Sequence, residues 1–447
     1  MAAELLRMCP TVQELPDHWR VKRLGSFCTK IGSGATPRGG SEVYLNSRIS
    51  HALVRSQHVF DRHFDSAGLA FISETHASEL RNAEVQSGDV LLNITGDGVT
   101  FGRSCIVPDR VLPACVNQHV SIIRPDRHEC DPGYLLSVLT HPATKGYIES
   151  FNSGGSRRAI TKGHIESFEI PLPPLAEQRA IAAVLGALDD KIELNRRMNA
   201  TLEAMAWALF HSWFVDFDPA RAKLDGRQPL GFNTTTAALF PNEFEDSELG
   251  HIPKGWTAQR LPDAVEVNPR RTLKAGVVAP YLDMKNLPTQ GHSAEKVIDR
   301  EFTSGTKFQN GDTLLARITP CLENGKTGYV DFLEDGQVGW GSTEYIVLAP
   351  KPPLPPQFGY LLARSEALRV HAIQNMTGTS GRQRVPSECF SNFLLVVPTP
   401  EVACRFDELT APLMAKIKSN STESRTLGTL RDTLLPKLLS GELRIAA

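Results

Sequence analysis

Several short segments carry residue types that could bind a phosphate, a dinucleotide or a metal ion, but their spacing fits none of these sites. Glu323–Thr327 reads ENGKT, yet a phosphate-binding P-loop needs a glycine where Pro320 stands. The glycines of GSGATPRGG (Gly32–Gly40) do not follow the GxGxxG spacing of a dinucleotide site. Three histidines lie close together without the spacing of a zinc site: His51, His58 and His63.

The sequence gives no support for catalysis. An adenine-methyltransferase tetrapeptide of the [DN]-P-P-[FYW] kind is missing, because Asn268-Pro269 is followed by Arg270. Aspartate and glutamate are plentiful, but none recurs in a paired acid and base pattern that spacing alone identifies. A stand-alone nuclease or methyltransferase therefore has no motif to rest on.

Composition sets the broad class of the protein. A chain of 447 residues exceeds what one hydrophobic core usually supports, so we expect two or more domains. No apolar run is long enough to span a membrane, and the first residues do not form a secretory signal. The eight cysteines contain no CxxC pair, which indicates reduced thiols in the cytoplasm rather than disulfides or a zinc site.

The net charge of −2 counts against a simple reading as a nucleic-acid binder, which often carries a basic excess. Phosphate binding depends on local lysine and arginine rather than on the total. A near-neutral DNA reader would need clustered basic loops or a partner that supplies more of the electrostatic attraction.

The chain repeats itself, and the repeat predicts its architecture. LPDHWRVKRLG (Leu15–Gly25) returns as IPKGWTAQRLP (Ile252–Pro262), and SGDVLLNIT (Ser87–Thr95) returns as NGDTLLARIT. From Arg157 onward the halves align without a gap at a spacing of 225 residues, and ten of the 53 positions from there to Leu209 are identical. Ordinary residue frequencies would give about three.

Each half begins with short β-branched runs between Gly, Pro and Asp turns, and ends in a long amphipathic helix. The helices begin at Pro173-Pro174-Leu175 and at Thr399-Pro400-Glu401, where threonine is a good N-cap and proline fits the first turn. We expect Pro436 to end or kink the second helix and Gly441 to stop it.

Apolar residues on both helices keep a seven-residue period, which predicts a coiled-coil seam. The two stripes, with their companion positions, are Ile181, Leu188, Asn195, Leu202 and Leu209 (with Val184, Met198 and Met205), and Phe406, Leu413, Asn420, Leu427 and Leu434 (with Leu409 and Leu430).

Each stripe has one polar member, Asn195 in the first helix and Asn420 in the second. Two interpretations stay open at this point. Each asparagine is partly exposed where the helices splay, or the two face each other and fix the register, as a lone polar residue in a seam does.

These features together resemble the specificity subunits of Type I restriction–modification systems, over nearly the whole chain. No single segment decides the likeness, but their order, duplicated around two long helices, is specific. The segments are LPDHWRVKRLG, GSGATP, GDVLLNITG, PLPPLAEQRAIAAVLGALDDKIELNRR, WFVDFDPARAK, IPKGWTAQRL, GDTLLARITPCLENGK and LLPKLLSGELRI.

The resemblance implies an α+β fold with two mixed target-recognition domains, separated by two long antiparallel coiled-coil helices in a pseudo-twofold repeat. We predict target-recognition domains at 1–174 and 251–398, spacer helices at 175–215 and 399–447, and a linker at 216–250.

The resemblance also implies what the chain binds. Each domain would read one half of a split double-stranded DNA site, and the helices would hold two methyltransferase subunits. Those partners would carry the S-adenosylmethionine chemistry, and a restriction subunit would use ATP and Mg²⁺ when present. This chain itself would hold no cofactor.

A helix from Leu175 to Phe210 is about 50 Å long, more than one duplex turn of about 34–36 Å, so we expect a gap between the half-sites. Because the two halves differ in their recognition parts, the target should be asymmetric. The rival hypothesis is a coiled-coil scaffold with two protein-binding heads and no nucleic-acid role, which the near-neutral charge favours slightly.

Candidate DNA contacts are loop residues with short polar or basic side chains, since arginine binds guanine edges bidentately or binds phosphates. The alternative for each arginine is a solvated loop side chain. The strongest candidates are the two Gly/Ser-rich loops just ahead of the helices, because they are equivalent in the repeat. The first reads SGGSRRAI (Ser153–Ile160) and the second reads GTSGRQRV (Gly378–Val385). The full set is Ser33, Thr36, Arg38, Arg157, Arg158, Arg270, Arg271, Arg382 and Arg384.

Overall fold

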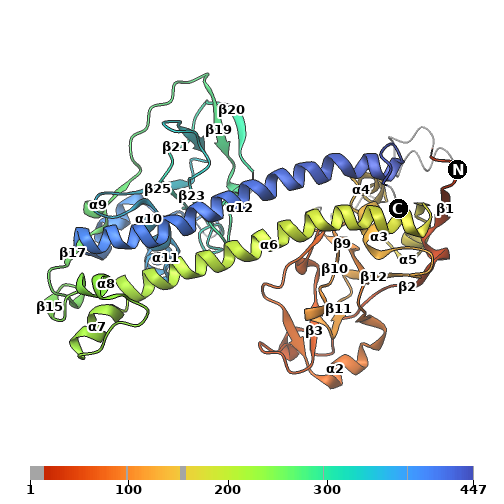
Figure 1. The fold of residues 1–447 in the computed structure, drawn as a ribbon, viewed down its shortest axis with the longest axis horizontal. Coiled ribbons are helices and arrows are strands. Elements are labelled where there is room, and N and C mark those ends of the chain that lie inside the picture. Colours follow the sequence, from red (N-terminus) through yellow and green to blue (C-terminus); the bar gives the residue numbers. More distant parts are fainter. Residues whose placement is uncertain (1–14, 97–98, 152–157, 295, 380, 446–447) are drawn as a thin grey trace. The chain divides into compact units, whose positions relative to one another are not determined.

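The computed structural model describes residues 15–96, 99–151, 158–294, 296–379 and 381–445 (Figure 1). Contacts divide the chain into two compact units, and we describe each by itself. Unit 1 comprises Met1–Leu194 and Ser424–Ala447, and unit 2 comprises Asn195–Glu423. Each of the two long helices therefore contributes one half to each unit.

Unit 1 contains two four-stranded sheets. The first has the order β10-β8-β12-β2, with bounds Ser104–Ile106, Val90–Asn93, Val120–Pro125 and Cys28–Ser33. The second has the order β6-β3-β11-β7, with bounds Ala70–Ile72, His51–Val54, Ala114–Val116 and Glu84–Val85. A smaller sheet pairs β1 (Arg20–Arg23) with β14 (Glu169–Leu172), and the helices are α2 (Glu74–Glu79), α3 (Pro132–Leu139), α4 (Pro142–Ser150) and α5 (Lys162–Glu166).

Unit 2 follows the same plan, which confirms the α+β class and the internal repeat. One sheet has the order β18-β25-β22-β23, with bounds Val265–Val267, Tyr345–Pro350, Thr313–Ala316 and Thr327–Tyr329. The other has the order β20-β19-β24-β21, with bounds Ile298–Glu301, Val278–Leu282, Gly339–Gly341 and Thr306–Phe308. A small sheet pairs β17 (Thr257–Arg260) with β26 (Leu394–Val397), and the helices that follow the sheets are α10 (Pro356–Arg364) and α11 (Glu366–Gln374).

The central strands are apolar on both faces because each lies between two cores. In β8, Val90 and Leu92 belong to one buried cluster while Leu91 belongs to another. In β22, Leu315 belongs to one buried cluster and Leu314 to another. Successive side chains of a strand point to opposite faces, so these short runs of apolar residues are fully buried strands.

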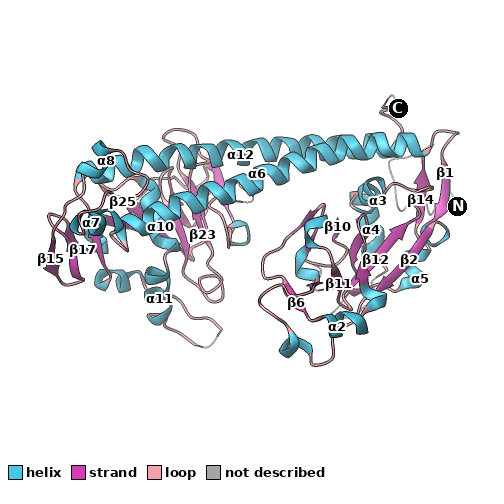
Figure 2. Cartoon of the chain, turned by 60° about the horizontal axis from the view of Figure 1, so that its bottom comes forward, coloured by secondary structure: helices cyan, strands magenta, loops and turns pink. Residues whose placement is uncertain are grey.

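The long helices are α6 (Leu175–Phe214) and α12 (Pro400–Ser440). Within each unit their halves run side by side and antiparallel (Figures 1 and 2). In unit 1, Asp189 of α6 bonds Arg431 of α12 at 2.8 Å. In unit 2, Asn199 bonds Ser421 at 3.1 Å and the rings of Phe214 and Phe406 lie 4.8 Å apart.

One detail of the helix prediction is wrong and another is confirmed. The second helix does not end at Pro436 but continues to Ser440, because Leu435, Leu438 and Leu439 are buried in a core of unit 1. Gly441 then has a φ of 73°, the left-handed conformation that commonly ends a helix.

The companion positions are also in part misplaced. Val184, Met205 and Leu430 are exposed, whereas Leu185 and Ala206, one residue further along, are buried. A companion position either three or four residues after a stripe residue satisfies a seven-residue period. The pattern alone therefore did not show which side of each helix packs against the sheets.

The stretch 216–250, which we predicted as a linker, has structure of its own. It contains α7 (Asp218–Leu224), α8 (Thr234–Ala238) and β15 (Phe244–Ser247). Phe240 is buried, and its ring lies 4.9 Å from that of Trp213 on α6. The aromatic end of α6 therefore belongs to a core of unit 2. Within the described part of the chain, no helix combines the length and apolar character needed to cross a membrane.

Candidate nucleic-acid interface

In unit 1, three strands of one sheet meet at a common edge. Ser33 at the end of β2 is opposite Ser121, and Asn93 at the end of β8 is opposite Val120 at the start of β12. The turns that leave these strands consequently lie together, and the amide of Gly34 bonds the carbonyl of Asn117 at 3.2 Å.

The turns at this edge hold a chain of polar side chains, here called the unit 1 edge cluster: Thr36, Gln118, His119 and Thr95. The Thr36 hydroxyl donates to Gln118 Oε1. Gln118 Nε2 lies 3.3 Å from His119 Nε2, and Thr95 Oγ1 lies 2.6 Å from His119 Nδ1. All four side chains are at least partly exposed, so the cluster presents hydrogen-bonding groups to solvent.

The predicted residues Ser33 and Arg38 lie beside this cluster, and both are exposed. A recess of about 450 Å³ is lined by Thr36, Arg38, Ala35, Glu79 and Leu80. Among the described residues Arg38 has no hydrogen-bond or ion-pair partner, so its guanidinium is available to a ligand.

The first Gly/Ser-rich loop returns to the same edge. Arg158 lies in β13 (Arg158–Ala159), opposite Gly96 of β9 (Thr95–Gly96). Arg157 lies outside the described residues. The structure thus brings the backbone of Arg158 next to Thr95 of the unit 1 edge cluster.

Unit 2 has an equivalent edge with different side chains. The amide of Arg317 bonds the carbonyl of Glu344 at 3.0 Å. The equivalent bond in unit 1 joins the amide of Ile94 to the carbonyl of His119. Arg384 lies opposite Ile318 and binds the Glu344 carboxylate, with Nε at 2.9 and 3.0 Å from its two oxygens. The pair Glu344–Arg384 is here called the unit 2 edge pair.

Sequence reasoning missed Gln118, His119 and Glu344. The sequence signal was a short polar turn between two apolar runs, VNQHV in unit 1 and GSTEY in unit 2. Such a turn is common in any sheet protein, so only the pairing of the strands shows that it joins the predicted loops.

The structure places the remaining predicted arginines separately. Arg382 is exposed in the loop that precedes Arg384, and Arg270 is exposed just after β18. Arg271 instead donates from Nη2 to Asp312 Oδ1 at 2.8 Å, at the start of β22. It lies away from the unit 2 edge pair, which is at the other end of that strand.

Asp312 belongs to the repeated Gly-Asp motif. Its bond to Arg271 shows why the aspartate of this motif recurs in both units. In unit 1 the equivalent Asp89 binds Arg124 at 2.7 Å. Both aspartates are buried and accept a bond from the amide three residues earlier. Burial raises the pKa of Asp312, and the bond from Arg271 opposes that shift. The contact therefore stabilises the start of the strand in each unit.

Comparison with known proteins agrees with this plan. The family described as "Type I restriction modification DNA specificity domain" matches residues 16–204. The HindI specificity subunit of Haemophilus influenzae is 24% identical over 80% of this chain and 87% of its own length. The MjaIX specificity subunit of Methanocaldococcus jannaschii is 23% identical over 97% of this chain and 95% of its own.

The chain is similar to Type I restriction–modification specificity subunits over most of its length. A solved S subunit of a Type-I restriction-modification system from M. genitalium has the same fold, with a TM-score of 0.55 and 14% identity over 96% of this chain and 97% of that one. The chain consists of two similar units, each of which contains one half of both long helices.

The two polar seam residues of the chain are buried, so the interpretation as splayed, partly exposed side chains is wrong. Asn195 Nδ2 donates to Glu423 Oε2 at 2.8 Å and lies 3.4 Å from the Asn420 carbonyl. Asn420 Nδ2 donates to Asn199 Oδ1 at 2.9 Å. Their role in fixing the register remains a prediction, which these cross-helix bonds favour.

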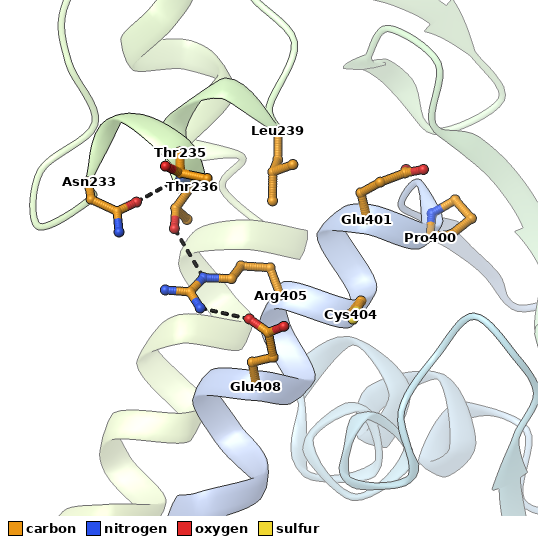
Figure 3. Close-up of a pocket in the computed structure, with 9 residues that line it drawn as sticks. All are labelled: Asn233, Thr235, Thr236, Leu239, Pro400, Glu401, Cys404, Arg405 and Glu408. Atoms are coloured by element: carbon orange, nitrogen blue, oxygen red, sulfur yellow. Dashed lines mark hydrogen bonds and ion pairs between the residues drawn. The ribbon is translucent and has the colours of Figure 1, made fainter.

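A second recess, in unit 2, has a different character (Figure 3). It has a volume of about 590 Å³ and lies between α8 and the start of α12. Arg405 there donates to Thr236 Oγ1 at 3.0 Å and to Glu408 at 2.7 Å. Because its arginine is already bonded and Glu401 and Glu408 add negative charge, this recess is unsuited to a phosphate backbone.

The described residues hold no candidate metal centre. Among them no three His, Cys, Asp or Glu side chains are placed to hold a metal ion, and the seven described cysteines are unbonded. Burial raises the pKa of the Cys115 and Cys389 thiols to about 11, so both stay protonated at neutral pH and are poor nucleophiles.

Proposed function

We propose that the chain reads an asymmetric, two-part sequence in double-stranded DNA, each unit binding one half through its edge. One observation carries the proposal: two units with the same strand plan present different polar side chains at the equivalent edge. A unit with the unit 1 edge cluster and a unit with the unit 2 edge pair would select different bases, because side chains recognise bases by their donors and acceptors.

The family supports this function, and it favours DNA recognition over the alternative of a protein-binding scaffold. As a specificity subunit the chain has no catalytic role of its own. It acts on DNA together with other subunits of the complex. With a net charge of −2, the chain needs those partners or its loop arginines for attraction to phosphates.

The finer assembly belongs to the same proposal. We infer two methyltransferase subunits, which would bind S-adenosylmethionine, and restriction subunits that would use ATP and Mg²⁺ when they join. This chain would hold no cofactor. We place the complex in the cytoplasm, where these cofactors and the DNA are found and where the thiols stay reduced.

The test is to map methylated adenines across the genome of cells that express this chain with its methyltransferase partner. We expect a gapped, non-palindromic motif, with two unlike halves. A continuous palindrome, or no sequence preference at all, would count against two unlike reading units.

The first Gly/Ser-rich loop gives a second test. The double change Arg157→Ala and Arg158→Ala should weaken DNA binding and lower the salt slope of log K by about 2, because each phosphate contact contributes about 0.9. Titration of the reconstituted complex at several salt concentrations measures both.

The matched control for this loop is Arg157→Lys with Arg158→Lys, which keeps the charge and should keep the slope. A well-folded alanine double mutant with unchanged affinity would remove this loop from the interface.

A further inference from the structure

The unit 2 edge pair holds the side chain of Arg384 in one orientation. Arg384 Nε lies 2.9 and 3.0 Å from the Glu344 oxygens, and Nη2 lies 2.7 Å from Oε1. Glu344 is fixed in turn, because its amide bonds the Ser342 hydroxyl at 3.1 Å and its carbonyl accepts from Arg317.

The backbone of Arg384 is held on both sides. Its amide and carbonyl each bond Thr377 at 2.9 Å, which closes the loop that carries Arg382. On the other side the neighbouring residues pair with the chain after β22, with Val385 bonding the Arg317 carbonyl at 2.8 Å. The guanidinium is therefore placed by regular backbone pairing although its side chain is 46% exposed.

Glu344 occupies only one edge of this guanidinium. A guanidinium has five N–H groups, and a carboxylate at Nε and Nη2 leaves the edge formed by Nη1 and Nη2. Within the described part of the chain, no group other than Glu344 bonds the Arg384 guanidinium. That second edge has two parallel donors, which match the O6 and N7 acceptors of guanine in the major groove.

The carboxylate also decides between a base and a phosphate. A phosphate at the open edge would carry its negative charge close to Glu344, and like charges repel. The guanine edge is neutral and meets no such cost. Glu344 thus orients the arginine and disfavours its use as a simple phosphate contact.

We propose that Arg384 is a specificity-determining residue that reads a guanine in the half-site bound by unit 2, and that Glu344 is its positioning residue. This inference rests on the proposed function. It is specific to unit 2, because the equivalent positions in unit 1 are Ala159 and His119, which cannot form the same pair.

The experiment uses the whole chain in complex with its methyltransferase partner and compares methylated motifs for the wild type and Arg384→Ala. One guanine position in one half of the motif should become degenerate, with about a 10- to 100-fold loss of discrimination. The other half should be unchanged. Arg384→Lys keeps the charge but not the two parallel bonds, so the same position should relax while the salt slope is retained.

Glu344→Gln separates positioning from folding. It removes the charge but keeps an acceptor, so we expect the preference for guanine to weaken while thermal stability and the other half-site stay unchanged. Arg227→Ala, which changes an exposed arginine of unit 2 that pairs with Asp225 and is not a candidate contact, should leave all base preferences unchanged.

The proposal is overturned if Arg384→Ala leaves the motif intact, or if it lowers affinity and the salt slope equally for all sequences, as loss of a phosphate contact would. If the wild-type complex shows no motif at all, the proposed function itself fails, and the two failures are thereby distinguished.

Discussion

Replacing Asp189 by alanine should lower the free energy of unfolding of unit 1 by about 3 kcal/mol, because it leaves two arginines without their shared partner. Asp189 Oδ2 accepts from Arg62 Nε at 2.6 Å, and Oδ1 accepts from Arg431 at 2.8 Å. The Arg62 side chain is only 5% exposed, so water cannot replace the lost bond.

This aspartate joins three parts of unit 1. Arg62 belongs to the turn after β4 (Val59–Phe60), Asp189 to α6 and Arg431 to α12, and Arg62 also donates to the Ser137 hydroxyl of α3 at 3.1 Å. Loss of the Asp189 carboxylate should therefore loosen the packing of both long helices against the sheets of unit 1, and its effect should extend beyond a single contact.

Hydrogen exchange of the full-length protein, read for peptides of α6 and α12 in unit 1, measures the effect together with calorimetry. Asp190→Ala is the matched control, since Asp190 is the exposed neighbour on the same helix. If both variants exchange alike, the shared aspartate does not hold unit 1 together.

Lengthening α6 and α12 by seven residues each should lengthen the unread gap of the DNA target by about 3 base pairs and leave both half-sequences unchanged. Seven residues add about 10 Å of helix, and a base pair occupies about 3.4 Å. A full heptad keeps the apolar stripe in phase, so the seam should still form.

The insertions belong after Leu194 in α6 and after Glu423 in α12, where contacts divide the chain into its two units. Motif mapping with the partner methyltransferase is the measurement. The control replaces seven existing residues at these points by the inserted sequence, without adding length. A lengthened chain that still selects the original gap would refute the idea that the helices act as a ruler.

Much of the fold was readable from the sequence because its signals are local. The apolar runs in SGDVLLNIT and NGDTLLARIT predicted strands, and the structure has strands there at Val90–Asn93 and Thr313–Ala316. The seven-residue period predicted both long helices, and α6 begins at the expected Leu175. The internal repeat added information on the overall architecture that local signals do not contain, because it showed that the two sets of strands share one plan.

What the sequence did not predict depends on packing between distant segments. Pro436 remains within α12 because neighbouring leucines are buried, and Arg271 turns to Asp312 because that carboxylate is buried and needs a cation. Gln118 and Glu344 became candidates only when strand pairing placed their turns beside the predicted loops. Of the predicted contacts, Thr36 and Arg384 lie in these edge groups.

The burial of β8 and β22 between two cores has a consequence for how such proteins diversify. Each strand is fixed on both faces by residues such as Leu91 and Leu314, while the turns at its end are polar and exposed. Mutations in those turns would therefore change the selected bases with little effect on folding. Natural variants should accumulate new targets by altering Gln118, His119 or Glu344 long before they alter the strands beneath.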